Sequence, residues 1–435
     1  MGFMSNSRVT IPKGSSYKVE GPASIRLLEG SLSVLGKPVK IKESLTVPRS
    51  RSLPLEAIEN SVVEVKAGPE AKIEPLSSAT IPREWYITID RIIGAGAPLR
   101  VMVFGDIDSG KTTFCTYLAN RFIEAGFKVG VLDCDPGQAE VFVPTTISLG
   151  LIKDYVTSLD KAVLKSAYFI GATSPSGLTD RVIVGAKILF EEAVREGVEA
   201  LIINTSGWTT GRGARFLKAG LLGALKPSHL VLIQRSTEVE HLAKPYINFK
   251  EVEVLRVPVS SAIKARSKED RRVKRELAYK GYFARAKIRK YSLDVTGLMY
   301  TLYTTGFKMS KERKSEVESI LGLEVIYGEE GPDSMFVVVD KPISNSSEAA
   351  LKLKEAFGKE EVLVIHRGAE KGLIAGLIGQ ASTLLGLGII EEIDYEERTI
   401  SLLTPFEGQV SIIQVGQLKL DEEGRELAKI EGWPL

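Results

Sequence analysis

The sequence has few of the residues on which disulfide, zinc and histidine chemistry depend. Its 435 residues include two cysteines, Cys115 and Cys134, and three scattered histidines. Two cysteines do not make a disulfide framework, and they favour a reducing compartment such as the cytoplasm. With no cysteine cluster and so few histidines, the sequence gives no support to a zinc site or a histidine-based hydrolase.

An excess of charge of one sign and a membrane-spanning run are also missing. The net charge is +2 with a pI near 8.2, which is too mild to indicate a nucleic-acid partner, so any basic surface must be local. The most apolar stretch, residues 372–390, contains glycines and the polar residues Gln380, Ser382 and Thr383, which favours a packed soluble segment. The first residues show no signal-peptide pattern. We therefore expect no membrane partner.

One complete phosphate-binding motif is present. Residues 105–112 read Gly-Asp-Ile-Asp-Ser-Gly-Lys-Thr, after an apolar run at 99–104 and before apolar residues at helical spacing. Glycines let backbone N–H groups wrap phosphates, Lys111 can reach the β and γ phosphates, and Thr112 can bind Mg²⁺. The sequence therefore predicts a site for ATP or GTP. The predicted nucleotide-binding residues are Gly105, Asp106, Ile107, Asp108, Ser109, Gly110, Lys111, Thr112 and Thr113.

The pattern around this motif predicts an α/β protein in three parts. Residues 1–95 contain short alternating runs broken by Gly and Pro, which indicate a small N-terminal β-domain. Residues 96–285 alternate strands and helices, as in a P-loop NTPase-type doubly wound parallel sheet. Residues 286–435 return to short strands with one Lys/Glu-rich helix near 346–357, and predict a mixed, β-rich C-terminal domain. The expected later strands of the central sheet are 128–132, 165–170, 200–203 and 229–233, and the expected helices are 180–196 and 212–225.

Two further motifs follow predicted strands, where the ligand crevice of such a sheet lies. In Asp133-Cys134-Asp135-Pro136-Gly137-Gln138, one carboxylate can take a proton from an attacking hydroxyl or serve Mg²⁺, and the other can support it; an acidic turn is the plain alternative. In the turn at 204–208, Asn204 stands where related NTPases carry an Asp, so metal organisation must fall to Asp133 or Asp135. Trp208 is suited to stacking on a base, unless it packs in the core.

Two more segments contain candidate substrate contacts. The turn at 171–177 contains Thr173 and Ser174, whose hydroxyls can bind phosphate or cap the next helix. The charged stretch at 266–275 is rich in arginine and predicts a helix near 266–283. This helix is either a lid over the triphosphate or a solvated surface.

Together these motifs resemble the polynucleotide 5′-hydroxyl kinase family of archaea and eukaryotes, which includes the RNA kinase subunit of the pre-mRNA cleavage factor and a pre-ribosomal RNA-processing relative. The resemblance rests on Gly-x4-Gly-Lys-Thr at 105–112, Asp-x-Gly-Gln at 135–138, Thr-x-Gly-Trp at 205–208 and Arg-Ser-Lys-x-x-Arg at 266–271. Weaker likeness at 28–36 and 386–390 extends it over nearly the whole chain.

The resemblance implies γ-phosphate transfer from ATP or GTP to the 5′-hydroxyl of RNA, with DNA left open, and partners in an RNA-processing complex. It implies that Asp135 is the general base and that Thr112 binds Mg²⁺. We expect Asp133 to orient Mg²⁺-bound water. The implied catalytic residues are Lys111, Asp135, Arg266 and Arg271, the implied RNA contacts are Gln138, Thr173, Ser174 and Trp208, and Leu35 is implied in the purine pocket.

Two other interpretations stay open. A regulatory GTPase or metal-insertion NTPase shares the phosphate loop, but the chain lacks an Asn-Lys-x-Asp guanine motif and has Asn204 in place of a carboxylate. An ATP-bound scaffold of an RNA-processing complex that does not turn over is the second. Intact Lys111, Asp135, Arg266 and Arg271 weigh against it.

Overall fold

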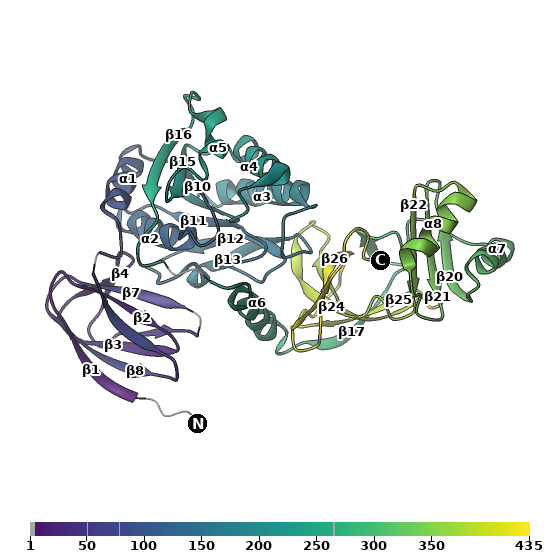
Figure 1. The fold of residues 1–435 in the computed structure, drawn as a ribbon, viewed down its shortest axis with the longest axis horizontal. Helices are drawn as coiled ribbons and strands as arrows, with labels where there is room; N and C mark the ends of the chain where they lie inside the picture. Colours follow the sequence, from purple (N-terminus) through teal and green to yellow (C-terminus); the bar gives the residue numbers. More distant parts are fainter. Residues whose placement is uncertain (1–4, 50, 78, 264–265) are drawn as a thin grey trace. The chain divides into compact units, whose positions relative to one another are not determined.

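The computed structural model describes residues 5–49, 51–77, 79–263 and 266–435. Backbone contacts divide the chain into two compact units. The first comprises residues up to 142, 146–168 and 174–274, and the second comprises residues 143–145, 169–173 and 275–435. Figure 1 shows the elements of both.

The first unit begins with two small sheets of alternating buried and exposed residues, as predicted for the N-terminal β-domain. One sheet has the order β1-β8-β3-β6 and the other β5-β4-β7-β2-β9. In β7, Leu53, Leu55 and Ala57 are buried while the residues between them are exposed or half-buried. The strands are β1 (Ser5–Ile11), β2 (Ser16–Glu20), β3 (Ala23–Glu29), β4 (Leu32–Val34), β5 (Lys37–Val39), β6 (Ser44–Val47), β7 (Ser52–Ala57), β8 (Ser61–Ala67) and β9 (Lys72–Leu76).

A seven-stranded sheet follows, in the order β13-β12-β11-β14-β10-β15-β16. The strands β10, β11, β14, β15 and β16 are parallel, so the predicted doubly wound α/β core is confirmed. The strands are β10 (Leu99–Gly105), β11 (Val129–Cys134), β12 (Thr146–Ile152), β13 (Val163–Phe169), β14 (Ala200–Thr205), β15 (His229–Gln234) and β16 (Glu253–Pro258). The helices are α1 (Arg83–Gly94), α2 (Lys111–Glu124), α3 (Thr179–Arg195), α4 (Gly211–Leu225), α5 (Glu240–Ala243) and α6 (Lys268–Phe283), with short turns η1 (Leu159–Lys161) and η2 (Lys244–Tyr246).

The sheet differs from the expected all-parallel arrangement at β12. β12 was not predicted, and it runs antiparallel to β11, with Asp133 opposite Ser148. A strand that pairs with its sequence neighbour through a short connection needs no crossover helix, so no helix separates β11 from β12. The central sheet is therefore mixed.

Helix α1 joins the N-terminal sheets to the central sheet and was also not predicted. Its Trp85 is fully buried, donates from Nε1 to the carbonyl of Pro258 in β16 at 2.8 Å, and meets the Phe114 ring of α2 edge-on at 5.0 Å between centroids. An indole buried with its N–H satisfied is a strong anchor. The buried apolar residues of the N-terminal sheets, α1, α2 and the central sheet form one hydrophobic cluster.

The second unit contains two sheets. A seven-stranded sheet includes β17 at one edge and pairs in the order β17-β25-β24-β23-β26-β18, with β27 on β26. A four-stranded sheet has the order β19-β20-β21-β22 and packs against α7 and α8. The sequence predicted α8 but not α7. The elements are β17 (Lys287–Ser292), β18 (Gly297–Met299), β19 (Phe307–Lys308), α7 (Lys311–Leu321), β20 (Val325–Glu330), β21 (Ser334–Val339), α8 (Ser346–Phe357), β22 (Glu361–His366), β23 (Leu373–Ile378), β24 (Leu384–Asp394), β25 (Thr399–Thr404), β26 (Ile412–Leu420) and β27 (Glu426–Lys429).

The apolar stretch at 372–390 forms β23 and the first part of β24, both in the core of this unit. Among the described residues, no helix is long and apolar enough to cross a membrane.

Candidate active site

The phosphate-binding loop connects β10 to α2. Its Lys111 is buried, and Nζ donates to the carbonyls of Gly105 at 2.9 Å and Asp106 at 2.6 Å. Burial lowers the pKa of Lys111 to about 8, against the opposing charges of Asp135 and Asp106. The ammonium group is thus held inside the loop, where a triphosphate can take over its hydrogen bonds.

Backbone geometry explains why this loop needs glycine at two positions. A Cβ at Gly105 would lie 2.3 Å from the Ser109 hydroxyl, and Gly110 has a φ of +87° with Ile263 2.7 Å from where a Cβ would be. Gly110 also precedes α2 without capping it by a side chain, which leaves the first N–H groups of the helix for an anion. The buried Ser109 hydroxyl has no hydrogen-bond partner among the described residues.

Asp135 lies directly after β11. Its Oδ1 accepts hydrogen bonds from the backbone N–H groups of Gly137 at 3.0 Å and Gln138 at 3.1 Å. These bonds use one carboxylate oxygen to fix the turn, and none of the hydrogen bonds found in the described part of the chain uses Oδ2. The turn thus presents a half-buried carboxylate whose charge acts on Lys111.

Asp133 is instead buried inside the sheet, with both oxygens accepting hydrogen bonds. Oδ2 accepts from the backbone N–H of Glu140 at 2.7 Å, and Oδ1 accepts from the Asn204 amide at 3.0 Å. Burial raises the pKa of Asp133 to about 7, and the Glu140 and Asn204 hydrogen bonds oppose that rise. Asn204 therefore donates a hydrogen bond to Asp133, but as a neutral amide it does not compensate the charge of the carboxylate. The expected Mg²⁺ role of Asp133 stays a prediction.

The turn after β14 lies against the phosphate loop. A Cβ at Gly207 would lie 2.9 Å from Ile107, and the Thr209 hydroxyl donates to Asp106 Oδ1 at 3.2 Å. Trp208 is half-buried, and its ring covers Gly213 of α4 so closely that a Cβ there would be 2.4 Å from Cη2. The indole is therefore a partly exposed platform on α4 rather than a core residue, as stacking requires.

One buried cation at this turn was missed in the sequence. Lys218 of α4 is fully buried, and Nζ donates to the Thr205 hydroxyl at 2.8 Å and to the Ser206 carbonyl at 2.7 Å. Burial lowers its pKa to about 7, and the charge of Lys111 adds to this effect. The sequence did not indicate that Lys218 is buried, because a lysine in an amphipathic helix usually lies on the exposed face.

The helix predicted near 266–283 is present as α6, and residues at and just before its N-terminal end contact the phosphate loop; its role as a lid stays a prediction. Arg271 Nη1 lies 3.1 Å from Asp108 Oδ2, and the backbone N–H of Arg266 donates to the same oxygen at 2.9 Å. The structure thus brings both predicted lid arginines to the loop, although residues 264–265 lie outside the described part.

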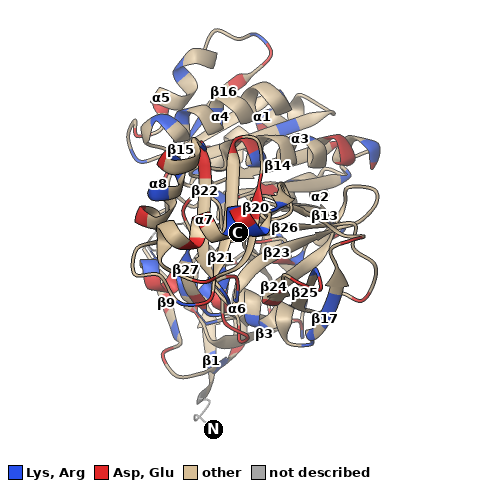
Figure 2. Cartoon of the chain, turned by 90° about the vertical axis from the view of Figure 1, so that its right-hand side faces the viewer, with Lys and Arg blue, Asp and Glu red and all other residues tan. Residues whose placement is uncertain are grey.

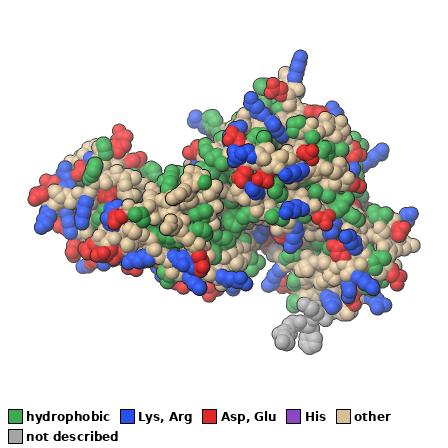
Figure 3. Space-filling view, turned by 180° about the vertical axis from the view of Figure 1, so that it is seen from behind, with side chains coloured by type: hydrophobic (Ala, Val, Ile, Leu, Met, Phe, Trp, Pro, Cys, Tyr) green, Lys and Arg blue, Asp and Glu red, His purple; other side chains and the backbone are tan. Residues whose placement is uncertain are grey.

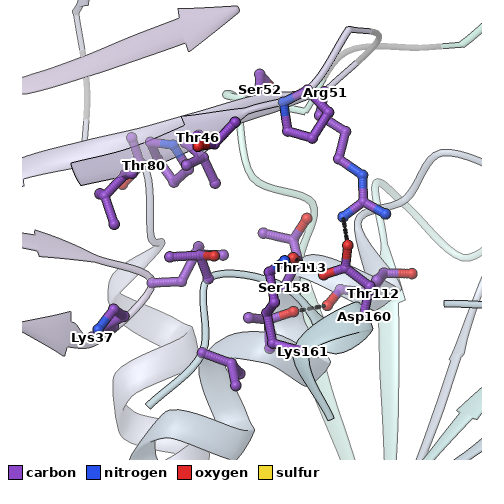
Figure 4. Close-up of a pocket in the computed structure, with 18 of the residues that line it drawn as sticks. Lys37, Thr46, Arg51, Ser52, Thr80, Thr112, Thr113, Ser158, Asp160 and Lys161 are labelled. Atoms are coloured by element: carbon purple, nitrogen blue, oxygen red, sulfur yellow. Dashed lines mark hydrogen bonds and ion pairs between the residues drawn. The ribbon is translucent and has the colours of Figure 1, made fainter. Parts of the chain in front are cut away.

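A cavity of about 460 Å³ opens beside the loop, between α2 and the N-terminal sheets. Figure 4 shows Thr112 and Thr113 of α2 on one side and Thr46, Arg51 and Ser52 on the other. Leu35 lines the cavity, and its carbonyl accepts from Asn120 Nδ2 of α2 at 2.7 Å. Asn120 also bonds the backbone of Val156 through Oδ1 at 2.8 Å. The residue predicted from resemblance for the purine pocket thus lies at a cavity next to the phosphate loop.

Glu140 connects three parts of this site and was also missed in the sequence. Its buried carboxylate is 3.0 Å from Arg51 of the N-terminal domain and 2.5 Å from Lys274 of α6. Although burial alone would raise it, Lys274 and Arg51 together lower the pKa of Glu140. Since its backbone N–H also donates to Asp133, Glu140 links α6, the cavity wall and the acidic turn.

The three other residues predicted to contact RNA, Gln138, Thr173 and Ser174, make only local contacts or none in the described part of the chain. Gln138 Nε2 donates to the Gly137 carbonyl at 2.8 Å. Ser174 Oγ accepts from the N–H of Ser176 at 3.2 Å, and the buried Thr173 hydroxyl has no partner in the described residues. Ser174 belongs to the first unit and Thr173 to the second, so their contact with substrate stays a prediction.

Among the described residues, no group of three or more His, Cys, Asp or Glu side chains could form a metal site by itself. The hydroxyl of Thr112 and the carboxylates of Asp133 and Asp135 are hard oxygen donors. Oxygen donors of this kind suit Mg²⁺, which takes most of its ligands from phosphates and water rather than from a protein cage. Both oxygens of Asp133 already accept hydrogen bonds, so Thr112 and Asp135 are the freer donors.

The chain is similar to known proteins over most of its length. Residues 105–285 match the family model described as the P-loop of mRNA cleavage and polyadenylation factor CLP1. A Pyrococcus abyssi protein named polyribonucleotide 5′-hydroxyl-kinase is 30% identical over 354 residues, covering 81% of this chain and 96% of its own. A protein of the same name from Methanocaldococcus jannaschii is 29% identical over 355 residues, covering 81% and 95%.

More distant relatives extend the match to eukaryotes. The Xenopus tropicalis polyribonucleotide 5′-hydroxyl-kinase Clp1 is 23% identical, covering 89% of this chain and 87% of its own. The structure of a Clp1p–Pcf11p complex matches with a TM-score of 0.66 at 13% identity, over 96% of this chain and 99% of that one, and supports the fold.

Proposed function

Since the chain belongs to the family of polyribonucleotide 5′-hydroxyl kinases, we propose that it transfers the γ-phosphoryl group of ATP, or of GTP, to the 5′-hydroxyl of RNA. The observation that carries the proposal is that the phosphate loop holds Lys111 buried at the start of α2, while the turn after β11 presents the half-buried Asp135 carboxylate, whose Oδ1 is fixed by the N–H groups of Gly137 and Gln138. The two groups are near enough that the charge of Asp135 raises the pKa of Lys111 against the larger effect of burial. The proposal assigns the γ-phosphate to this cation and the hydroxyl proton to this base.

In the proposed reaction, the RNA 5′-oxygen attacks the γ-phosphorus and its proton passes to the Asp135 carboxylate. The bond from the γ-phosphorus to the bridging oxygen breaks, and ADP leaves. Lys111 and the first N–H groups of α2 bind the charge on the phosphates, and Arg266 and Arg271 stabilise the charge that develops during transfer.

Thr112 and Asp133 are the residues proposed for Mg²⁺, which would neutralise phosphate charge and align the oxygens for in-line transfer. Trp208 stacks on the terminal base, Gln138 positions the same nucleotide, and Thr173 and Ser174 contact its phosphate. The cavity at Leu35 takes the purine of the nucleotide. A cytoplasmic location and partners in an RNA-processing complex remain part of this proposal.

Mass analysis of the products tests the proposal. The protein is incubated with ATP, Mg²⁺ and a short RNA that carries a 5′-hydroxyl, beside the matching DNA and the same RNA with a 5′-phosphate. We expect one phosphate added to the 5′-hydroxyl RNA per ADP formed, and none added to the 5′-phosphorylated RNA. ADP without transfer would indicate an NTPase, and bound ATP without turnover would indicate a scaffold.

A further inference from the structure

Positive charge is concentrated in one short segment outside the active site. Five of the eleven residues from 280 to 290 are Lys or Arg and none is Asp or Glu, in a chain whose 57 basic and 55 acidic residues nearly cancel. Figure 3 shows the two signs interspersed over the face it draws. The segment is therefore a local departure from the even charge of the chain.

The structure places this segment at the end of α6 and in β17, all within the second unit. β17 is an edge strand, and Figure 2 shows much of it in the colour of Lys and Arg. Its neighbour β25 places Thr404, Leu403, Leu402 and Ser401 opposite residues 287–290, so no acidic side chain faces the cations across the pair.

Most of the cations in the segment are unpaired. Arg289 forms an ion pair with Glu407. The other four are exposed, and among the described residues none of them is in an ion pair; they are Lys280, Arg285, Lys287 and Lys290. Ile288, between them, is 66% exposed. Each such cation that neutralises a phosphate of a nucleic acid releases a counterion condensed on the backbone, which favours binding.

Protection of a sheet edge explains only part of the pattern. Lysine on an edge strand blunts the edge, which accounts for Lys287 and Lys290 on β17. Lys280 and Arg285 precede the strand and are not explained in this way. A polyanion that spans several cations fits all four positions.

We propose that the segment 280–290 binds the phosphate backbone of substrate RNA at nucleotides beyond the 5′ end that is phosphorylated. This inference rests on the proposed function, which supplies RNA as the polyanion. The segment adds affinity for long RNA without reading sequence, because phosphate contacts carry no base information.

The test compares two RNA lengths and two salt concentrations. In one variant Lys280, Arg285, Lys287 and Lys290 are changed to Gln. In a matched control Lys308, Lys311, Lys341 and Lys429, which are exposed cations of the same unit, are changed to Gln. RNA affinity is measured by fluorescence anisotropy with a trinucleotide and with a 30-nucleotide single strand.

For the 30-nucleotide RNA, four phosphate contacts contribute about −3 to the slope of log affinity against log salt. Between 50 and 200 mM salt the native protein should therefore lose about 50-fold more affinity than the segment variant. The control should keep the native slope, and trinucleotide phosphorylation should be unchanged in both variants. As a safeguard against misfolding, the single change Lys290→Gln should reduce the slope by about 0.7.

Equal slopes in the segment variant and the control would overturn the proposal. So would loss of binding to a polyglutamate probe with RNA binding unaffected, which would assign the segment to an acidic protein. If the native protein phosphorylates no RNA, the proposed function fails, and the failure is recognised without the salt data.

Discussion

The carboxylate of Asp108, in the phosphate-binding loop, lies 3.1 Å from the guanidinium of Arg271, in helix α6. The same oxygen accepts the backbone N–H of Arg266. The arginine that is proposed to bind the triphosphate is thus already paired with a carboxylate of the loop. In the proposed reaction, phosphate replaces Asp108 as the partner of Arg271, so we expect the pair to oppose nucleotide binding.

Removal of the Asp108 charge should strengthen ATP binding. In Asp108→Asn, Arg271 loses its competing carboxylate, and we expect ATP to bind about 3- to 10-fold more tightly, in line with about 1 kcal/mol for a partly exposed pair. Titration calorimetry without RNA measures this. Asp90→Asn, which removes a carboxylate paired with Arg121 instead, should leave the affinity unchanged. Weaker binding in Asp108→Asn would show that the pair supports the site rather than competing with it.

Glu140 should be important for both stability and lid position. Glu140→Gln leaves Lys274 and Arg51 facing a neutral group in a buried site, and we expect the free energy of unfolding to fall by about 3 kcal/mol. In a double-mutant cycle with Lys274→Gln, the coupling should exceed about 1 kcal/mol. The exposed Arg49–Glu70 pair gives the matched comparison, since Glu70→Gln should cost less than about 0.5 kcal/mol. Equal losses from the two glutamates would refute the role of Glu140.

The position of the Trp208 ring can be tested without changing the tryptophan. Gly213→Ala places a Cβ 2.4 Å from the ring and must displace it. We expect about a tenfold loss of affinity for the 5′-terminal nucleotide, as base stacking is lost. Gly223→Ala, in the same helix and facing open space, adds the same methyl and should not affect binding. Native affinity in Gly213→Ala would argue against stacking on Trp208.

The buried Lys218 predicts a pH dependence of stability with a definite sign. Its pKa is about 7 in the folded protein, against about 10.4 in an unfolded chain. Between these values the unfolded chain binds one more proton, so this residue makes the free energy of unfolding rise with pH, by up to about 1.4 kcal/mol per pH unit. Lys218→Met should remove that contribution from guanidinium unfolding curves at pH 7.5 to 9.5. Lys153→Met, at an exposed position, should retain it; identical slopes in the two variants would contradict the assignment.

Local patterns predicted the parts of the site that are continuous in sequence. The loop at 105–112, the turn at 135–138 and the parallel strands before them follow from glycine geometry and apolar runs. β12 was missed because it pairs antiparallel with β11, and such a pair needs no connecting helix that the sequence pattern could reveal. α7 was missed because a charged helix with Val317 as its one fully buried residue shows little periodicity.

The contacts that link distant segments could not be predicted. Glu140 meets Arg51 and Lys274 across 89 and 134 residues, and Asp108 meets Arg271 across 163. Nothing in the sequence near Glu140 distinguishes it from a surface carboxylate. Only the packing of the N-terminal sheets and α6 around the central sheet gives it two cations.

The most direct test of the account is single-turnover transfer of the γ-phosphate from labelled ATP to 5′-hydroxyl RNA, compared between the native protein and Asp135→Asn. The amide keeps the shape of the carboxylate but cannot take the proton. We expect ATP to bind with near-native affinity while the transfer rate falls by about 10²- to 10⁴-fold; Lys111→Ala should lose transfer as well. Native rates in Asp135→Asn would contradict the proposed base, and absence of transfer by the native protein would contradict the kinase itself.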